Sequence, residues 1–360
     1  MTGVYIIAEA GVNHNGSVDT AVELIDVATA AGADAVKFQT FRSESVISRA
    51  ARKAQYQITN TGNDESQLEM VRALELSVAQ HRVLIDHARS KGIAFLSSPF
   101  DLESLHVLTE EFRLPRLKIA SGEITNIPLL VAAGRAGCPL ILSTGMSTLA
   151  EVERALQIIA FGFVAPRDAR PTVAGLEAAY FDTKAQSLLR ERLTLLHCTT
   201  EYPAPVQEVN LRAMNTMRAA FGLPVGFSDH TPGIHIAIAS AALGAEVIEK
   251  HFTLDRNLPG PDHVASLEPG ELAAMVRGIR DVEQALGSGR KLPAPSEMKN
   301  IPIARKSLIA ARAIKKGEAF SEINLTTKRP GTGVSALRFY DYVGRNAPRD
   351  YSADDLIDEL

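Results

Sequence analysis

The sequence predicts an α/β fold, a (β/α)8 TIM barrel followed by a small mixed-β domain. Eight apolar runs alternate with amphipathic segments over about 285 residues, which is the size and rhythm of such a barrel. The runs are nearly continuous in apolar residues, as expected for parallel strands that are buried on both faces. An open doubly wound sheet is the alternative, although no GxGxxG motif follows the first run.

Each expected strand is followed by a helical segment. The helical period is clear in residues 17–31 and 77–91, where apolar side chains recur on one face. Glycines of the type that ends helices follow several of these segments, at Gly32, Gly92, Gly137 and Gly244. The strands are expected at residues 4–10, 35–40, 93–99, 116–121, 139–144, 193–199, 224–228 and 246–252.

The domain boundaries follow from changes in this rhythm. Residues 1–286 form the expected barrel, in which 162–192 is a partly helical insertion between the fifth and sixth strands. Residues 287–300 are rich in Gly, Pro, Ser and charge and are predicted to be a linker. Residues 301–360 carry short apolar runs and turn signals such as "KKGE", which predict a small domain of marginal independent stability.

Composition excludes several classes of protein. The net charge of −4 gives no reason to expect a nucleic-acid partner. Two cysteines, Cys138 and Cys198, indicate a reducing compartment and no disulfide scaffold. No apolar stretch reaches the ~20 residues of a membrane span, and the first residues lack the basic region of a signal peptide. We therefore expect a cytoplasmic enzyme without a membrane partner.

Polar residues collect at the predicted carboxyl ends of the strands, where barrels of this kind place their chemistry. Lys37, Gln39 and Lys118 alternate into otherwise apolar strands, and a buried lysine needs an anionic partner. One lysine alone could be an edge residue or a member of an ion pair. Together with serines at neighbouring strand ends, the two predict a phosphate or carboxylate site: Ser98, Ser121, Ser143 and Ser228.

His230 and His251 are the best candidates for metal ligands. They lie one βα unit apart, so they would project from adjacent strand ends and could share one ion. Each alone could equally be a hydrogen-bonded histidine at a strand end. Two histidines without a cysteine partner leave coordination positions open for substrate and water, which favours a catalytic site.

Nine motifs, in order, resemble those of the bacterial sialic acid synthases, and the resemblance runs from residue 4 to about 355. Together they are highly specific. The motifs are "IAEAGVNHNGS", "GADAVKFQT", "KIASGEITNIPLL", "ILSTGMS", "LHCTTEYPAP", "VNLRAMNT", "GFSDHT", "IEKHFTLDRNLPGPDH" and "KRPGTG".

The resemblance implies a C–C bond-forming transferase that joins phosphoenolpyruvate to an N-acylated mannosamine-type sugar, giving a nine-carbon sialic acid and phosphate by C–O cleavage. It also implies a divalent metal, Mn²⁺ before Mg²⁺ or Co²⁺. The C-terminal domain would be a SAF (type III antifreeze-like) domain, which in a domain-swapped homodimer caps the partner's barrel.

Site roles follow position by position from the same resemblance. His230 and His251 match the metal ligands, while Glu9, Glu123 and Asp262 match catalytic carboxylates. Asn63, Tyr202 and Arg329 match sugar-binding positions, the last of them reaching across the dimer. The positions that match phosphoenolpyruvate ligands are Lys37, Gln39, Ser98, Lys118, Ser121, Ser143, Thr200 and Ser228, with Thr200 standing where some members have Asn.

The motif "HFTLDRNLPGPDH" and the insertion resemble the subgroup that makes legionaminic acid from 2,4-diacetamido-2,4,6-trideoxymannose. N-acetylmannosamine, the neuraminic acid precursor, is the other candidate sugar. Three further possibilities are a pseudaminic acid synthase of the same family, a metal-dependent hydrolase on a TIM barrel, and a non-enzymatic ice or carbohydrate binder. A metal-dependent hydrolase usually binds its metal with more His and Asp ligands than these strand ends offer.

Overall fold

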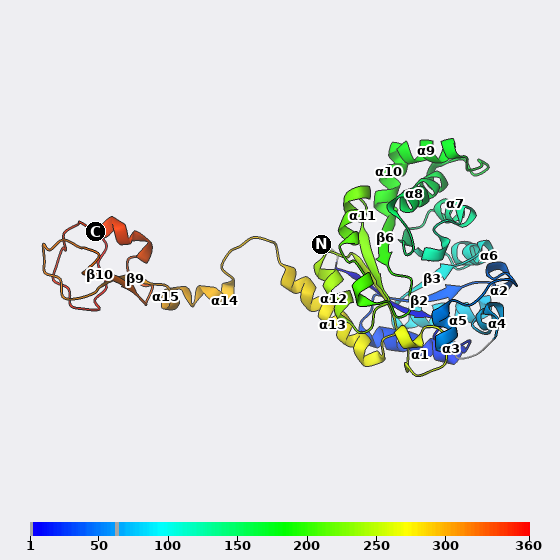
Figure 1. The fold of residues 1–360 in the computed structure, drawn as a ribbon, viewed down its shortest axis with the longest axis horizontal. Coiled ribbons are helices and arrows are strands. Elements are labelled where there is room, and N and C mark those ends of the chain that lie inside the picture. Colours follow the sequence, from blue (N-terminus) through cyan, green and yellow to red (C-terminus); the bar gives the residue numbers. More distant parts are fainter. Residues whose placement is uncertain (1–2, 62–64) are drawn as a thin grey trace. The chain divides into compact units, whose positions relative to one another are not determined.

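The computed structural model describes residues 3–61 and 65–360, which divide into two compact units with the boundary between Gly287 and Ser288. Figure 1 shows a strand-and-helix unit that contains the N-terminus and a small unit that contains the C-terminus. Each unit has its own hydrophobic core, so each is described by itself.

The first unit is the predicted (β/α)8 barrel. Its eight strands pair in parallel in the order β3-β2-β1-β8-β7-β6-β5-β4. Over residues 65–360, β3 and β4 pack against each other without a backbone ladder. The strands are β1 (Tyr5–Gly11), β2 (Ala35–Thr40), β3 (Ala94–Pro99), β4 (Leu117–Ile119), β5 (Leu140–Ser143), β6 (Leu193–Cys198), β7 (Val225–Asp229) and β8 (Val247–His251).

Helices surround the strands, and their ends carry the expected caps. Ser17 accepts a hydrogen bond from the Thr20 amide at the start of α1, and Gly32 ends that helix with a left-handed φ of 80°. The helices are α1 (Val18–Ala31), α2 (Ser43–Val46), α3 (Gln55–Thr61), α4 (Gln67–Ala73), α5 (Val78–Lys91), α6 (Leu102–His106), α7 (Ile127–Ala136), α8 (Leu149–Val164), α9 (Val173–Phe181), α10 (Thr183–Arg192), α11 (Ala213–Phe221), α12 (His235–Ala242) and α13 (Pro269–Leu286).

The insertion before β6 is more helical than the sequence indicates, because most of it belongs to the end of α8 and to α9 and α10. Helix α8 crosses α7 very closely. A β-carbon on Gly134 would lie 2.8 Å from the Ile159 carbonyl oxygen, and one on Gly162 would lie 2.8 Å from the Val131 carbonyl oxygen. Only glycine allows the two backbones to approach so closely.

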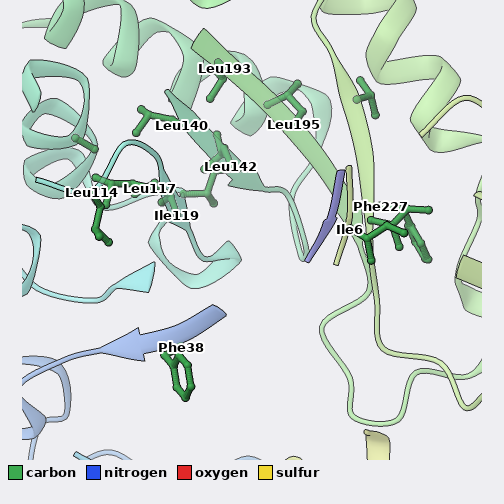
Figure 2. Packing of buried hydrophobic residues seen from close by; sticks show 14 of the residues in the cluster. Ile6, Phe38, Leu114, Leu117, Ile119, Leu140, Leu142, Leu193, Leu195 and Phe227 are labelled. Carbon is green, nitrogen blue, oxygen red and sulfur yellow. The ribbon is translucent and has the colours of Figure 1, made fainter. Parts of the chain in front are cut away.

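Two layers of apolar side chains make the barrel. Figure 2 shows the outer layer between strands and helices, which includes Ile6, Phe38 and Leu142. The inner layer fills the barrel and consists of Ile7, Ala35, Leu96, Ile141, Leu196 and Val247. Because strand side chains alternate with a period of two, the next inward positions toward the carboxyl end belong to the candidate site.

The second unit is built around one antiparallel pair, β9 (Ser307–Ala310) and β10 (Leu325–Lys328), with the short helices α14 (Pro295–Met298), α15 (Ile301–Ala304) and α16 (Phe339–Tyr342). Its core includes Leu308, Phe320 and Tyr342. Residues 288–300 are exposed throughout. Among the described residues of both units, no helix is long and apolar enough to cross a membrane.

Candidate active site

The inward alternation of the strands places one polar side chain after another at the carboxyl end of the barrel. On β1 the inward residue after Ile7 is Glu9, and on β2 Ala35 is followed by Lys37 and then Gln39. These residues open into a cavity of about 300 Å³. Among its other lining residues are Ser98, Lys118, Ser121, Ser143, Cys198, Thr200, Tyr202, Ser228, His230, Glu249, His251 and Asp262.

The floor of the cavity is a buried network of two lysines and two carboxylates. Lys37 Nζ lies 2.6 Å from Glu9 Oε2 and 3.6 Å from Glu249 Oε2. Lys118 Nζ lies 3.2 Å from Glu249 Oε1, which also accepts a hydrogen bond from Ser228 Oγ at 2.8 Å. The predicted inward lysines are therefore present, and the barrel supplies carboxylate partners to both.

The two carboxylates differ in pKa. Burial raises the pKa of Glu9 to about 7, although Lys37 opposes that rise. For Glu249 burial also acts to raise the pKa, but Lys118, Lys37 and the Ser228 hydrogen bond outweigh it and hold the pKa below its usual range. Glu249 is thus the permanent anion, and Glu9 can take up or release a proton near neutral pH.

The two histidines meet beside this network, with ring centroids 5.5 Å apart. His230 Nδ1 donates to the Thr199 carbonyl oxygen at 2.6 Å, so its Nε2 carries the lone pair. His251 Nδ1 is buried with no hydrogen-bond partner in the described chain, and it lies 3.8 Å from Asp262 Oδ2. Burial lowers the pKa of His230 to about 4 and that of His251 well below its usual value, so both rings are neutral at pH 7.

This pair fits a metal ion. A neutral imidazole binds a metal through a ring nitrogen that carries a lone pair. The buried Nδ1 of His251 makes no hydrogen bond within the described residues and could therefore serve as such a ligand. Within residues 3–61 and 65–360, no three His, Cys, Asp or Glu side chains gather into a group that could hold an ion. A metal here would have two protein ligands, and solvent and substrate would complete its coordination.

Aromatic rings line one side of the histidine pair. The ring of Tyr202 lies 4.2 Å from that of His230, centroid to centroid, and 5.6 Å from that of His251. Tyr56 of α3 also lies next to Tyr202, with ring centroids 5.1 Å apart. Next to them is Asp262, and burial raises its pKa to about 6. Flat rings beside a carboxylate suit a ligand with both C–H faces and hydroxyl groups.

A second corner of the cavity is built from small polar groups. The Gly145 amide donates to Ser121 Oγ at 2.9 Å, and Ser121 Oγ lies 3.2 Å from Cys198 Sγ. A β-carbon on Gly145 would crowd the side chains of Thr200, Ser121 and Cys198, so the glycine gives these three polar groups room to come together. The buried hydroxyls of Ser143 and Thr200 have no hydrogen-bond partner among the described residues, which leaves them available to a ligand.

The structure brings most of the expected site residues together but not all. Glu123 is half-buried beside the cavity, where its carboxylate accepts a hydrogen bond from Asn126 at 2.6 Å. Arg329 belongs to the second unit, where its Nε donates to the Ala304 carbonyl oxygen. Asn63 lies outside the described residues. The others line the cavity.

Sequence reasoning missed three site residues. Glu249 precedes His251 by two positions on β8, so the period-two alternation would have placed it on the same inward face. Cys198 follows the inward Leu196 in the same way on β6. Tyr56 offers no such signal, because it reaches the site from α3, outside the strand ends.

Comparison with known proteins identifies similar families and relatives. A model described as the NeuB family matches residues 24–291, and one described as the SAF domain matches residues 305–359. An N,N'-diacetyllegionaminic acid synthase of Campylobacter jejuni is 51% identical over 100% of both chains. A protein of the same description from Legionella pneumophila is 43% identical, over 97% of this chain and 92% of the relative.

Solved structures show the same likeness. An N-acetylneuraminic acid synthetase from Leptospira borgpetersenii, solved in complex with citrate, superposes with a TM-score of 0.67 at 34% identity. The match covers 83% of this chain and 90% of that one.

Proposed function

Because the chain belongs to the NeuB family and carries a SAF domain, we propose that it is a sialic acid synthase. It condenses phosphoenolpyruvate with an N-acylated mannosamine-type sugar to a nine-carbon acid and phosphate. The sugar we propose first is 2,4-diacetamido-2,4,6-trideoxymannose, since the two relatives compared above are N,N'-diacetyllegionaminic acid synthases. The observation that carries this proposal is the cavity itself, where two buried lysines lie beside two neutral histidines.

The floor residues suit phosphoenolpyruvate. Lys37 and Lys118 supply two positive charges, and the unpartnered hydroxyls of Ser143 and Thr200 supply hydrogen bonds. In a buried site such groups hold phosphate and carboxylate strongly and need no reorganisation during the reaction. Gln39, Ser98, Ser121 and Ser228 line the same floor.

The reaction forms one C–C bond and one C–O bond from water, and it breaks the C–O bond to phosphate. The proton that water loses balances the proton that the aldehyde oxygen gains. The methylene carbon of phosphoenolpyruvate attacks the sugar aldehyde carbon, water adds to the enol carbon, and phosphate leaves from the resulting tetrahedral centre. Glu9 is better placed than Glu123 to handle the water proton, because it lines the cavity and its pKa lies near 7. Asp262 and Tyr202 would orient the sugar beside the histidines.

His230 and His251 would hold the divalent metal, most favourably Mn²⁺. When bound, it would polarise the aldehyde oxygen as a Lewis acid. We further propose a cytoplasmic homodimer in which the SAF domain of one chain caps the barrel of the other, so that Arg329 reaches the sugar's N-acyl group.

Two rival functions are less well supported. A metal-dependent hydrolase on this barrel would use more protein ligands than the two histidines seen among the described residues. A pseudaminic acid synthase would use a stereoisomer of the same diacetamido sugar, and the relatives compared above carry the legionaminic name.

The test incubates the full chain with Mn²⁺, phosphoenolpyruvate labelled with ¹⁸O at the bridging oxygen, and each candidate sugar separately. We expect phosphate that contains the label and a product whose mass equals sugar plus pyruvate. Lys118→Met should abolish turnover, whereas Lys91→Met, on the partly exposed end of α5, should not. Absence of phosphate release with every sugar would reject the synthase, and unlabelled phosphate would reject C–O cleavage.

A further inference from the structure

A buried ion pair lies behind the two histidines, on the side of the strands that faces away from the cavity. Lys250 Nζ on β8 lies 3.0 Å from Asp229 Oδ2 on β7, and both side chains are fully buried. The two residues are partners in the parallel ladder. Neither lines the cavity, so the proposed reaction gives the pair no part. Burying two charges costs free energy even when they pair, and apolar side chains would serve stability alone equally well.

The pair alternates with residues of the candidate site. On β7, Asp229 stands between Ser228 and His230. On β8, Lys250 directly precedes His251. Because strand side chains alternate between the two faces of a sheet, the flanking residues point into the cavity and the pair points to the outer face of the barrel.

Lys250 also contacts the residue that follows His230. Its ammonium group donates a hydrogen bond to the carbonyl oxygen of Thr231. Thr231 in turn donates to Asp229 Oδ1, from its amide at 2.9 Å and from its hydroxyl at 2.8 Å. One ammonium group on β8 therefore holds both the residue before His230 and the residue after it.

The backbone ladder does not extend to His230. The pairing of β7 with β8 ends at Asp229 and Lys250. Past that point the His230 carbonyl oxygen accepts from the Ala204 amide at 2.8 Å, and its ring donates to the Thr199 carbonyl oxygen. These two contacts join His230 to the segment that follows β6, whereas Lys250 joins it to the strand that carries His251.

We propose that the Lys250–Asp229 pair positions the two histidines for a divalent metal ion. This inference rests on the metal assignment made in the proposed function. With two protein ligands, the fit of the ion depends on the spacing of His230 and His251. Groups that orient metal ligands typically contribute 10- to 100-fold to metal affinity. The pair acts through the backbone next to each ligand, so we expect about tenfold, the lower end of that range.

The test removes both charges at once. Asp229→Asn together with Lys250→Met keeps an oxygen that accepts from Thr231 and a side chain of similar length at position 250. Removing a buried ion pair as a whole costs much less stability than removing one partner, which leaves an unpaired charge. The double variant should therefore melt near the unaltered protein, and each single variant should melt lower.

Binding is measured on the full chain without substrates. Mn²⁺ is titrated by electron paramagnetic resonance of the free ion, and the Kd should rise about tenfold in the double variant. Inorganic phosphate, titrated by calorimetry, should bind as it does to the unaltered protein, because Ser228 and Glu249 stay within the β7–β8 ladder.

Asp34→Asn together with Arg280→Met is the matched control. It makes the same kinds of change at an ion pair of 2.7 Å between the residue before β2 and α13, and neither residue lines the cavity. The Kd values for Mn²⁺ and phosphate should both stay unchanged.

A double variant that melts like the unaltered protein and binds Mn²⁺ as tightly would overturn the inference and leave the synthase intact. Equal losses of Mn²⁺ and phosphate affinity would overturn it too, since they indicate a general loosening of the strand ends. If the double variant does not fold, Asp229→Asn alone serves, and an unchanged Mn²⁺ Kd there counts against the inference. Failure of the unaltered protein to bind Mn²⁺ would reject the metal assignment itself.

Discussion

Glu249 connects the two lysines of the floor, where we propose that phosphoenolpyruvate binds. Its carboxylate touches Lys37, Lys118 and Ser228, which come from three different strands. A buried ammonium group is costly without a counter-charge, so Glu249 keeps both lysines in place before substrate arrives. Incoming phosphate and carboxylate groups would then share the lysines with a charge that is already there.

We predict that Glu249→Gln lowers the free energy of unfolding of the barrel by about 3 kcal/mol, because it leaves Lys118 buried without its carboxylate. The amide oxygen still accepts from Ser228, so the loss reports charge. Urea unfolding followed by far-UV circular dichroism measures it. Inorganic phosphate should stabilise this variant more than the unaltered protein, since it restores an anion.

Glu246→Gln is the matched control, because Glu246 is exposed just before the same strand. It should change the unfolding free energy by less than about 0.5 kcal/mol. Equal stabilities of the Glu249 and Glu246 variants would contradict the assigned role.

At the scale of elements, both ends of every barrel strand were predictable to within two residues, because buried parallel strands are apolar throughout. For example, the run predicted at 35–40 is β2 itself, and 246–252 contains β8. Alternation along β2 indicated that Lys37 faces inward, and the position of His251 at a strand end indicated that it lies near the same site; both residues line the cavity. Alternation could not place Tyr56, because Tyr56 reaches the cavity from α3, in the connection that follows β2.

The close contact between helices α7 and α8 was not predicted from the sequence. We predict that Gly134→Ala destabilises the barrel by about 1–3 kcal/mol, because the new methyl group would clash with the backbone of α8 at Ile159 and Gly162. Gly270→Ala in the first turn of α13 is the control, since a β-carbon there meets nothing within 4 Å. Thermal unfolding compares the two, and a Gly134 variant as stable as the control would refute the close crossing.

At the scale of the whole molecule, the chain divides into two units with separate cores, and the boundary between the units lies between Gly287 and Ser288. The run of Gly, Pro and charge at residues 287–300 is the sequence signal for a linker there. Arg329, whose role came from the family resemblance, belongs to the second unit, while the candidate active site lies wholly in the first. In the proposed homodimer both copies have the same sequence, so no pattern within one chain says which of the two barrels a SAF domain would cover.

The proposed domain swap can be tested by mixing two impaired variants. His251→Ala should lose the metal, and Arg329→Ala should raise the KM for the sugar. In a swapped dimer of the two variants, the barrel of the Arg329→Ala chain keeps both histidines and is capped by the SAF domain of the His251→Ala chain, which keeps its arginine. Sites with a normal KM for the sugar should therefore appear after subunit exchange. Arg345→Ala, exposed in the same unit, should leave the sugar KM unchanged.

Mass spectrometry of tagged chains verifies that subunits have exchanged. If the activity of the exchanged mixture then equals the sum of the activities of the two separate variants, the swap is contradicted.

The unbonded contact between β3 and β4 has a mechanical consequence. A ring of strands with one joint free of hydrogen bonds can change its circumference there without breaking a backbone ladder. Lys37 on β2 and Lys118 on β4 stand on opposite sides of that joint. The spacing between the two ammonium groups can therefore change at this joint without loss of a backbone hydrogen bond, within the limits set by Glu249, which contacts both.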